Sequence, residues 1–134
     1  KELGPASEGL FGTTSWLPGV NLGGNEQESL AFVEAFRKRF RAEPVPLTMH
    51  GYAAARTLLK SIESVAASGK AFTGETLREA LARADVQTPL GRVKFDDGGD
   101  PLFYERVVVQ IQGGRLVVVY PKERATATAR YPSR

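Results

Sequence analysis

Residues 88–121 read TPLGRVKFDDGGDPLFYERVVVQIQGGRLVVVYP, and along this stretch the apolar period of the chain changes from helical to extended. Val93 and Phe95 alternate with charged residues, and residues 103–111 alternate in the same way, which is typical of half-buried strands. Two glycine pairs, in DDGGD and QGGR, are typical of turns. The last run, RLVVVYP, is apolar on both faces, so we expect it to be the most buried strand. No catalytic side chain stands between the three runs.

Helical spacing precedes this stretch. Asn25, followed three residues later by Glu28, has the pattern of an N-cap and capping box, and apolar residues then recur with helical period. We therefore expect a first helix over residues 27–41. A second helix should start near Leu47 and stop at Gly69, a residue suited to the left-handed C′ position, and Thr73 should open a third.

A short strand is predicted over residues 10–16, closed by Leu-Pro-Gly. One strand, three helices and a hairpin-like meander contain no βαβ unit, yet amphipathic helices have to cover a sheet. We infer that much of the apolar helix surface packs on strands absent from this chain. Because the chain begins at Lys1 rather than Met, we also expect it to have been processed or excised.

Composition narrows the class of protein. The chain has 134 residues, 42% of them hydrophobic, which suits one ordinary domain. Its formal net charge of +3 resides in residues 122–134, which hold four basic residues and one acidic residue, so the other 121 residues carry 14 of each sign. A neutral body with a basic tail argues against a nucleic-acid surface. There are no cysteines, which excludes disulfides and thiolate metal sites.

The candidate motifs for chemistry are weak. His50 is the only histidine, so no site that needs two is present; it is either a lone ligand contact or, more commonly, a structural or exposed residue. DDGGD lacks the twelve-residue spacing of an EF-hand, and GVNLGGN has no P-loop lysine. FRKRFR, residues 36–41, fits the solvated side of an amphipathic helix. We therefore expect no enzyme activity, no metal site and no cofactor.

Trp16 stands where the predicted strand runs into a Pro-Gly turn. An indole at such a place offers a flat apolar wall with one N–H donor, which suits a small organic ligand. It equally suits a tryptophan that covers the end of a core, and the sequence leaves both interpretations open.

Four segments, in order, carry a family resemblance: SEGLFGTTSWLPG, FVEAFRKRFRAEPVPLTMHGYAAARTLLKSIESVAASG, LREALARADVQTPLGRVKFDDGGDP and VVVQIQGGRLVVVYP. Together, over residues 6–121, they resemble the C-terminal part of the branched-chain amino-acid type of periplasmic solute-binding protein, which serves ABC importers. The resemblance implies an α/β fold, part of a two-lobed structure with helices on a mainly parallel sheet and a C-terminal antiparallel ribbon.

The resemblance also implies a division of the chain. Residues 1–121 would be the C-terminal portion of a solute-binding domain, with a hinge strand near 9–16, lobe helices within 27–84, and a hairpin and return strands over 89–121. Residues 122–134 would be a flexible basic tail. The chain would be a fragment that lacks most of the ligand site, and alone we expect it to self-associate.

The function implied by the resemblance is capture of a small metabolite, a branched-chain amino acid or a related amide or aromatic acid, between two lobes. Delivery to a membrane permease would follow, in the periplasm or, for a membrane-anchored protein, outside the cell. Three residues match cleft-lining positions or lie beside them: Trp16, Leu47 and His50. The alternative is a ligand-sensing regulatory domain of the same fold, which an upstream signalling or DNA-binding domain would indicate, whereas a secretion leader would indicate transport.

Overall fold

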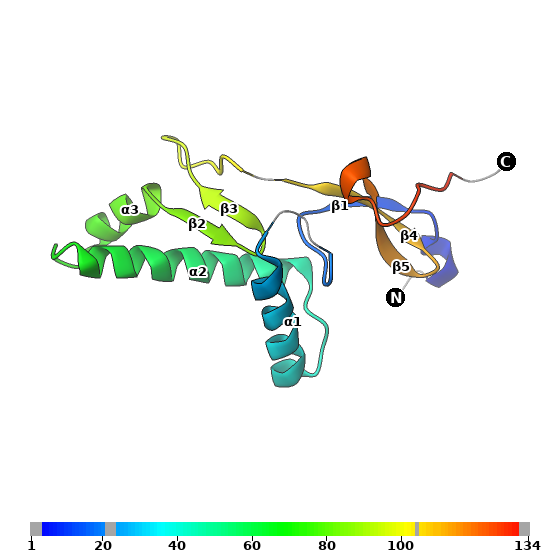
Figure 1. Cartoon of the computed structure of the whole chain (residues 1–134), viewed down its shortest axis with the longest axis horizontal. Helices are drawn as coiled ribbons and strands as arrows, with labels where there is room; N and C mark the ends of the chain where they lie inside the picture. The colour runs from blue at the N-terminus through cyan, green and yellow to red at the C-terminus, as the bar shows by residue number, and fades with distance from the viewer. Residues whose placement is uncertain (1–3, 21–23, 104, 132–134) are drawn as a thin grey trace. The chain divides into compact units, whose positions relative to one another are not determined.

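The protein is described by a computed structural model over residues 4–20, 24–103 and 105–131. Its contacts divide the chain into two compact units. We call residues 16–104 the helical unit, and residues 1–15 together with 105–134 the sheet unit. The chain passes between them twice, after Ser15 and before Glu105. Each unit is considered by itself (Figure 1).

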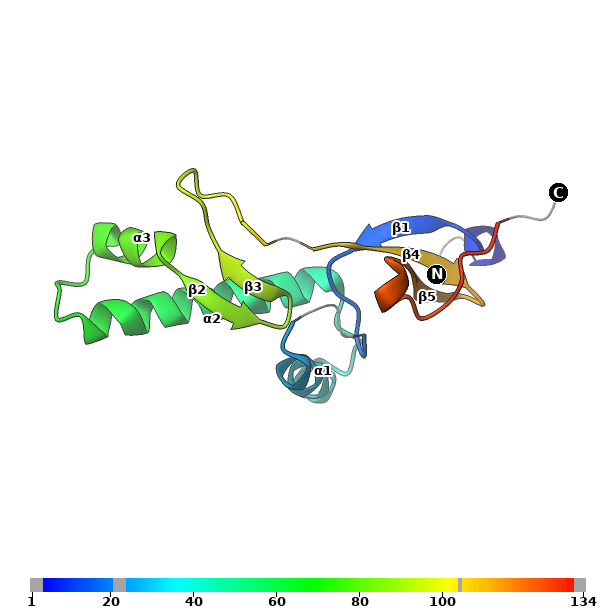
Figure 2. The ribbon, with the colours of Figure 1, turned by 45° about the horizontal axis from the view of Figure 1, so that its top comes forward.

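The helical unit contains three helices and one hairpin. The helices are α1 (Glu26–Phe40), α2 (Pro46–Ala67) and α3 (Gly74–Ala82), and the hairpin pairs β2 (Asp85–Thr88) with β3 (Gly91–Lys94). Both ribbon views show α3 and the hairpin lying beside the long helix α2 (Figure 1, Figure 2).

The helix ends confirm most of the capping predictions. The Asn25 side chain accepts a hydrogen bond from the Glu28 amide at 3.1 Å, as an N-cap should. The expected capping box is wrong, however, because the Asn25 amide donates to the Thr88 carbonyl while the Glu28 side chain binds α2. Gly69 has the predicted left-handed backbone, with φ of 69°.

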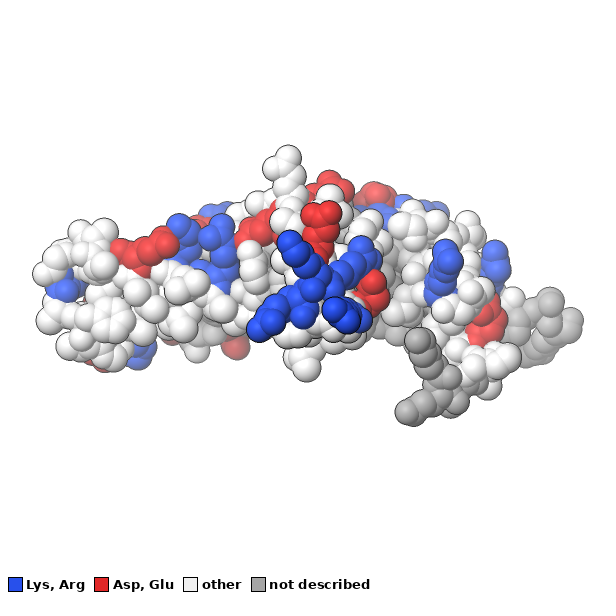
Figure 3. All heavy atoms as spheres, turned by 90° about the horizontal axis from the view of Figure 1, so that it is seen from below, with Lys and Arg blue, Asp and Glu red and all other residues white. Residues whose placement is uncertain are grey.

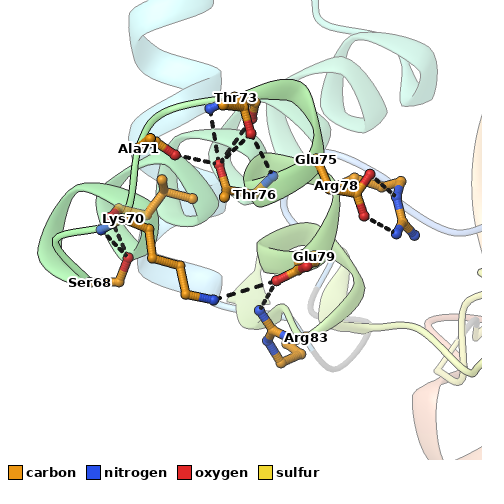
Figure 4. Close-up of polar contacts among 10 residues, drawn as sticks. Ser68, Lys70, Ala71, Thr73, Glu75, Thr76, Arg78, Glu79 and Arg83 are labelled. Carbon is orange, nitrogen blue, oxygen red and sulfur yellow. Dashed lines mark hydrogen bonds and ion pairs between the residues drawn. The ribbon is translucent and has the colours of Figure 1, made fainter.

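Thr73 caps α3 as predicted, and it shares a reciprocal pair of hydrogen bonds with Thr76. Figure 4 shows this cap together with charged side chains from α3 and the residues beside it. These side chains form ion pairs on the exposed surface, which add little stability individually. They are Glu75 with Arg78, and Glu79 with both Lys70 and Arg83.

One stripe of α2 is buried, at a spacing of four residues. The two hydroxyl side chains in this stripe can be buried because Thr57 and Ser61 each donate to the main-chain carbonyl one turn earlier. Outside this stripe the helix carries exposed apolar side chains, including Leu58 and Leu59. The buried stripe consists of Met49, Ala53, Thr57, Ser61 and Val65.

Strand β2 was not predicted. Its sequence, Asp-Val-Gln-Thr, has one strongly apolar residue and directly follows a helix, so no period of two is visible there. The pairing comes from its neighbour: Gly91 turns the chain with φ of 108°, and Arg92 makes two hydrogen bonds of 2.6 Å with Asp85 across the hairpin. Pairing within the hairpin has therefore overridden the strand propensity of the β2 sequence.

The sheet unit is built on three antiparallel strands in the order β1-β4-β5. They are β1 (Phe11–Thr14), β4 (Val107–Gln112) and β5 (Arg115–Tyr120), and the predicted Gly-Gly turn joins the last two. The predicted strand over residues 103–111 joins this sheet from Val107 onward. Residue 104 of that prediction lies outside the described part of the chain. All strand pairs among the described residues are antiparallel.

Burial in the sheet unit corrects a second prediction. The run RLVVVYP was expected to be the most buried strand, but β5 lies at the edge of the order and its residues Leu116 and Tyr120 are exposed. The central strand β4 is the most buried, with Val107, Val109 and Gln110 all buried. An apolar sequence on both faces therefore does not identify the central strand of this sheet.

Candidate functional site

Trp16, the first residue of the helical unit, lies in its core. Its side chain is 1% exposed and packs in one cluster with Val33 and Met49. The indole N–H donates to the Ser29 hydroxyl at 2.9 Å, so the polar atom of the ring is satisfied inside the protein. Of the two sequence interpretations, burial favours the core-covering one, and contact with a solute remains a prediction.

An aromatic group extends this core along α1 and α2. The Phe32 ring meets the Trp16 indole edge-on, with centroids 6.3 Å apart, and lies 4.9 Å from the Tyr52 ring. Aromatic pairs in this distance range add stability beyond their buried area. The start of the helical unit is thus packed against α1 and α2 through the rings of Trp16, Phe32 and Tyr52.

A polar cluster fixes the two helices beside these rings. The Tyr52 hydroxyl donates to Glu28 at 2.8 Å, and Arg56 donates to the same carboxylate oxygen at 2.7 Å. The Glu28 side chain is only 14% exposed, so its charge needs these partners. Burial raises the pKa of the Tyr52 hydroxyl, and its hydrogen bond to Glu28 acts in the same direction.

The other two predicted site residues lie in the first turns of α2. Leu47 is 78% exposed, so its apolar side chain is open to a partner. His50 is half-buried, and its Nδ1 lies 2.8 Å from the Pro46 carbonyl, which can only accept a hydrogen bond. Nδ1 therefore carries the hydrogen in this contact.

Sequence reasoning placed Trp16 and the start of α2 in one site, and the structure relates them through Met49. Met49 stands between Leu47 and His50 on α2 and is fully buried in the cluster that contains Trp16. The core cluster thus includes Trp16 and Met49, and Leu47 and His50 are not among the residues that form it or pack against it. The sequence did not predict that Ser29 pairs with Trp16 or that Glu28 pairs with Tyr52, because no local pattern indicates which distant residues these side chains contact.

The FRKRFR motif lies at the C-terminal end of α1, where Figure 3 shows basic side chains gathered beside an acidic one. Arg37 binds Glu43 through two hydrogen bonds of 2.8 Å, and this pairing lowers the pKa of the Glu43 carboxyl. Cations at the last turn of a helix also interact favourably with its dipole. The motif thus has the structural explanation expected from the sequence.

The acidic and glycine-rich motifs form turns. Asp96 accepts hydrogen bonds from the Gly98 and Asp100 amides, both at 2.9 Å, which closes the DDGGD turn. Of the GVNLGGN motif, residues 21–23 lie outside the described part, and Asn25 caps α1 itself. Over residues 4–20, 24–103 and 105–131, no group of three metal-ligating side chains comes together.

None of the helices described is both long enough and apolar enough to cross a lipid bilayer.

Comparison with known proteins identifies the family. Residues 1–115 match the family described as periplasmic binding protein. The chain is 28% identical over 124 residues to Leu/Ile/Val-binding protein homolog 7 of Brucella abortus, covering 89% of this chain and 28% of that protein. The chain therefore spans less than a third of the length of this relative.

Solved structures agree on the fold. A leucine-binding protein of Thermotoga maritima superposes with a TM-score of 0.66 at 27% identity, over 86% of this chain and 31% of that one. A solute-binding protein of an ABC transporter from R. palustris, in complex with benzoate, superposes with a TM-score of 0.70 at 22% identity, over 88% and 31%. These likenesses confirm the predicted α/β class as part of a periplasmic-binding-protein fold. With 115 of its 134 residues matched, the chain belongs to the periplasmic binding protein family.

Proposed function

We propose that this chain is part of the solute-binding component of an ABC importer, which holds a small metabolite between two lobes and delivers it to a membrane permease. The match of residues 1–115 to the periplasmic binding protein family carries the proposal. The fold likeness to a leucine-binding protein supports it. Binding would take place in the periplasm or, for an anchored protein, outside the cell.

The proposed solute is a branched-chain amino acid or a related amide or aromatic acid. A relative named for Leu/Ile/Val supports the amino-acid part of this range, and a structural neighbour solved with benzoate supports the aromatic-acid part. Both classes pair an apolar body with a carboxylate, and such a body needs an apolar wall in the site. Among the predicted site residues, Leu47 offers such a surface at the start of α2, and we propose it as the main contact from this chain.

The test is a thermal-shift screen of the full-length protein with L-leucine, L-isoleucine, L-valine, benzoate and acetamide. A solute that binds only the folded protein raises the melting temperature. A rise with any member of the panel supports the proposal, and no rise with any of them contradicts it. A signalling or DNA-binding domain encoded beside this chain would favour the sensing alternative instead.

The proposed contact is tested with Leu47→Ala, measuring the dissociation constant of the stabilising solute by calorimetry. Because the bound solute would bury the Leu47 side chain, its loss should weaken binding by about tenfold or more. Leu102→Ala is the matched control, because Leu102 is 52% exposed in the helical unit but is not a proposed contact. Equal effects of the two substitutions would remove Leu47 from the site. His50→Ala and Trp16→Phe extend the test to the other predicted residues.

The chain alone should neither bind solute well nor remain monomeric. Large apolar side chains are exposed on α1, on α2 and in the segment before α3, and we propose that they pack against parts of the whole protein that this chain does not span. Light scattering of the isolated 134-residue chain should show self-association. A monodisperse monomer with micromolar affinity for L-leucine would contradict this part of the proposal. The exposed side chains include Leu30, Phe40, Leu47, Leu59 and Phe72.

A further inference from the structure

The C-terminal segment of the sheet unit has defined contacts that the prediction of a flexible tail did not include. Residues 126–131, here called the strap, run along β5 and β4. The Thr126 and Ala127 amides donate to the Val118 carbonyl at 2.8 and 3.1 Å, and the Val118 amide donates to the Thr126 hydroxyl at 3.0 Å. At the end of the strap, the Tyr131 ring lies 6.1 Å from the Phe11 ring of β1.

Gln110, in the centre of β4, anchors the strap. Its side chain donates to the Arg130 carbonyl at 2.6 Å and accepts from the Arg130 amide at 2.8 Å. This reciprocal pair is the pattern that two antiparallel strands form with their main chains. The fully buried Gln110 side chain thus makes the hydrogen bonds to the strap that the main chain of a neighbouring strand would otherwise make.

The same side chain reaches the segment that leads into β1. Gln110 donates its other N–H to the Gly9 carbonyl at 3.0 Å, and its oxygen also accepts from Gln112 at 2.7 Å. All four hydrogen-bonding positions of the amide are therefore used. Gln112 in turn donates to the Thr128 carbonyl of the strap at 2.8 Å.

The two strands that Gln110 joins are the ones through which the chain leaves the sheet unit. β1 runs to Ser15, after which the chain enters the helical unit, and the chain returns just before β4. Thr14 and Val107 are paired at this end of the two strands. The strap lies beyond the family match, which ends at residue 115.

We propose that the strap holds these two connecting strands in one arrangement, with Gln110 as its positioning residue, and that solute affinity depends on this restraint. The inference rests on the proposed solute-binding function. A protein that is already ordered loses less conformational freedom when it binds its ligand, so it binds more tightly. Release of the strap should therefore weaken solute binding without removing any residue that contacts the solute.

The experiment uses the full-length protein with two variants that break the strap from opposite sides. Gln110→Leu removes the buried side-chain amide. Arg130→Pro removes the main-chain N–H that donates to the Gln110 side chain. Hydrogen exchange reports whether residues 126–131 are protected, and calorimetry gives the dissociation constant for L-leucine or benzoate, whichever stabilises the protein. Circular dichroism at the assay temperature checks folding, and Arg130→Pro keeps the test informative if Gln110→Leu does not fold.

Two matched controls carry the same substitutions elsewhere. Gln87→Leu changes an exposed glutamine of β2, and Asp97→Pro places proline at the second position of the DDGGD turn, which tolerates it. In the wild type we expect slow exchange of the Thr126, Ala127 and Arg130 amides. Both strap variants should exchange fast there and show a dissociation constant raised at least about fivefold, the lower end of typical coupling between distant sites. Both controls should stay within about twofold of the wild type.

Three results would overturn the inference: fast exchange of the strap in the wild type, unchanged affinity in variants whose strap exchanges fast, or the same loss of affinity in the controls. Tighter binding by the strap variants would also overturn it, since the restraint would then oppose binding. If the wild type binds no solute, the proposed function fails and the effect on affinity fails with it. The exchange comparison then still decides whether Gln110 anchors the strap.

Discussion

Tyr52 of α2 and Glu28 of α1 share a hydrogen bond of 2.8 Å between the phenol and the carboxylate, 24 residues apart in sequence. Arg56, one turn after Tyr52, donates to the same oxygen. The start of α1 is thereby fixed to α2 beside the Trp16 core, and the exposed Leu47 and half-buried His50 stand on the same helix as Tyr52. The proposed solute contacts thus rest on a helix held by this pair.

Tyr52→Phe should destabilise the helical unit by about 1 kcal/mol, because it removes one hydrogen bond while Arg56 still pairs with Glu28. Glu28→Ala should cost more, since it removes the carboxylate that accepts from both Tyr52 and Arg56. A double-mutant cycle by urea unfolding of the full-length protein measures the coupling between the two substitutions. Additive effects would show that the hydrogen bond contributes nothing of its own. Tyr131→Phe is the control, because that ring is 79% exposed.

Ser29→Ala should cost about 1–3 kcal/mol, because it leaves the buried indole N–H of Trp16 without its acceptor. Ser64→Ala, at an exposed position of α2, is the matched control and should change stability by less than about 0.5 kcal/mol. The measurement is the urea midpoint of the full-length protein. A Ser29 variant as stable as its control would mean that the indole finds another partner.

The sequence predicted the local structure well where side chains signal their own position. Asn25, Gly69 and Thr73 mark helix ends through capping preferences that depend only on neighbouring residues, and the helix bounds agree within about one or two residues. Contacts between different helices and strands were harder to predict from the sequence. β2 forms because β3 pairs with it, and Glu28 turns away from its expected cap because α2 offers it Tyr52 and Arg56.

The candidate site was predictable only in part, for the same reason. The family resemblance directed attention to Trp16, Leu47 and His50, but burial of Trp16 depends on Met49 and Val33, which come from two other segments. The sequence did not predict a buried role for Gln110, because an isolated glutamine in a strand usually faces solvent. Its burial follows from the strap, whose composition predicts no packing at all.

Gly24→Ala should destabilise the helical unit by roughly 1–3 kcal/mol, because a Cβ at this position would overlap the main chain of Pro89. The neighbouring hydrogen bond, from the Asn25 amide to the Thr88 carbonyl at 3.0 Å, prevents the loop from moving away without loss. Gly74→Ala is the control, since beyond its chain neighbours and its own helix backbone no atom lies within 4 Å of the added Cβ. Thermal unfolding of the full-length protein distinguishes the two, and equal melting temperatures would show that the loop yields freely.

Glu8 should contribute to loss of stability in acid. Its carboxylate accepts hydrogen bonds from the Gly113 amide at 2.8 Å and the Gly114 amide at 3.2 Å, at the turn between β4 and β5. These two bonds lower the pKa of the Glu8 carboxyl, and the charge of Arg130 acts in the same direction. A lowered pKa in the folded state means that the unfolded chain takes up the proton first as the pH falls.

The stabilising effect of Glu8 is therefore complete above the unfolded glutamate pKa of about 4.3 and is lost as the pH falls through the lower folded value. Glu8→Gln keeps the size of the side chain but cannot titrate, so the melting temperature of this variant should fall less steeply than that of the wild type between about pH 5 and pH 2.5. Glu123→Gln, at an exposed position of the same unit, is the control. Parallel pH profiles for the wild type and Glu8→Gln would show that the turn amides do not hold the carboxylate in solution.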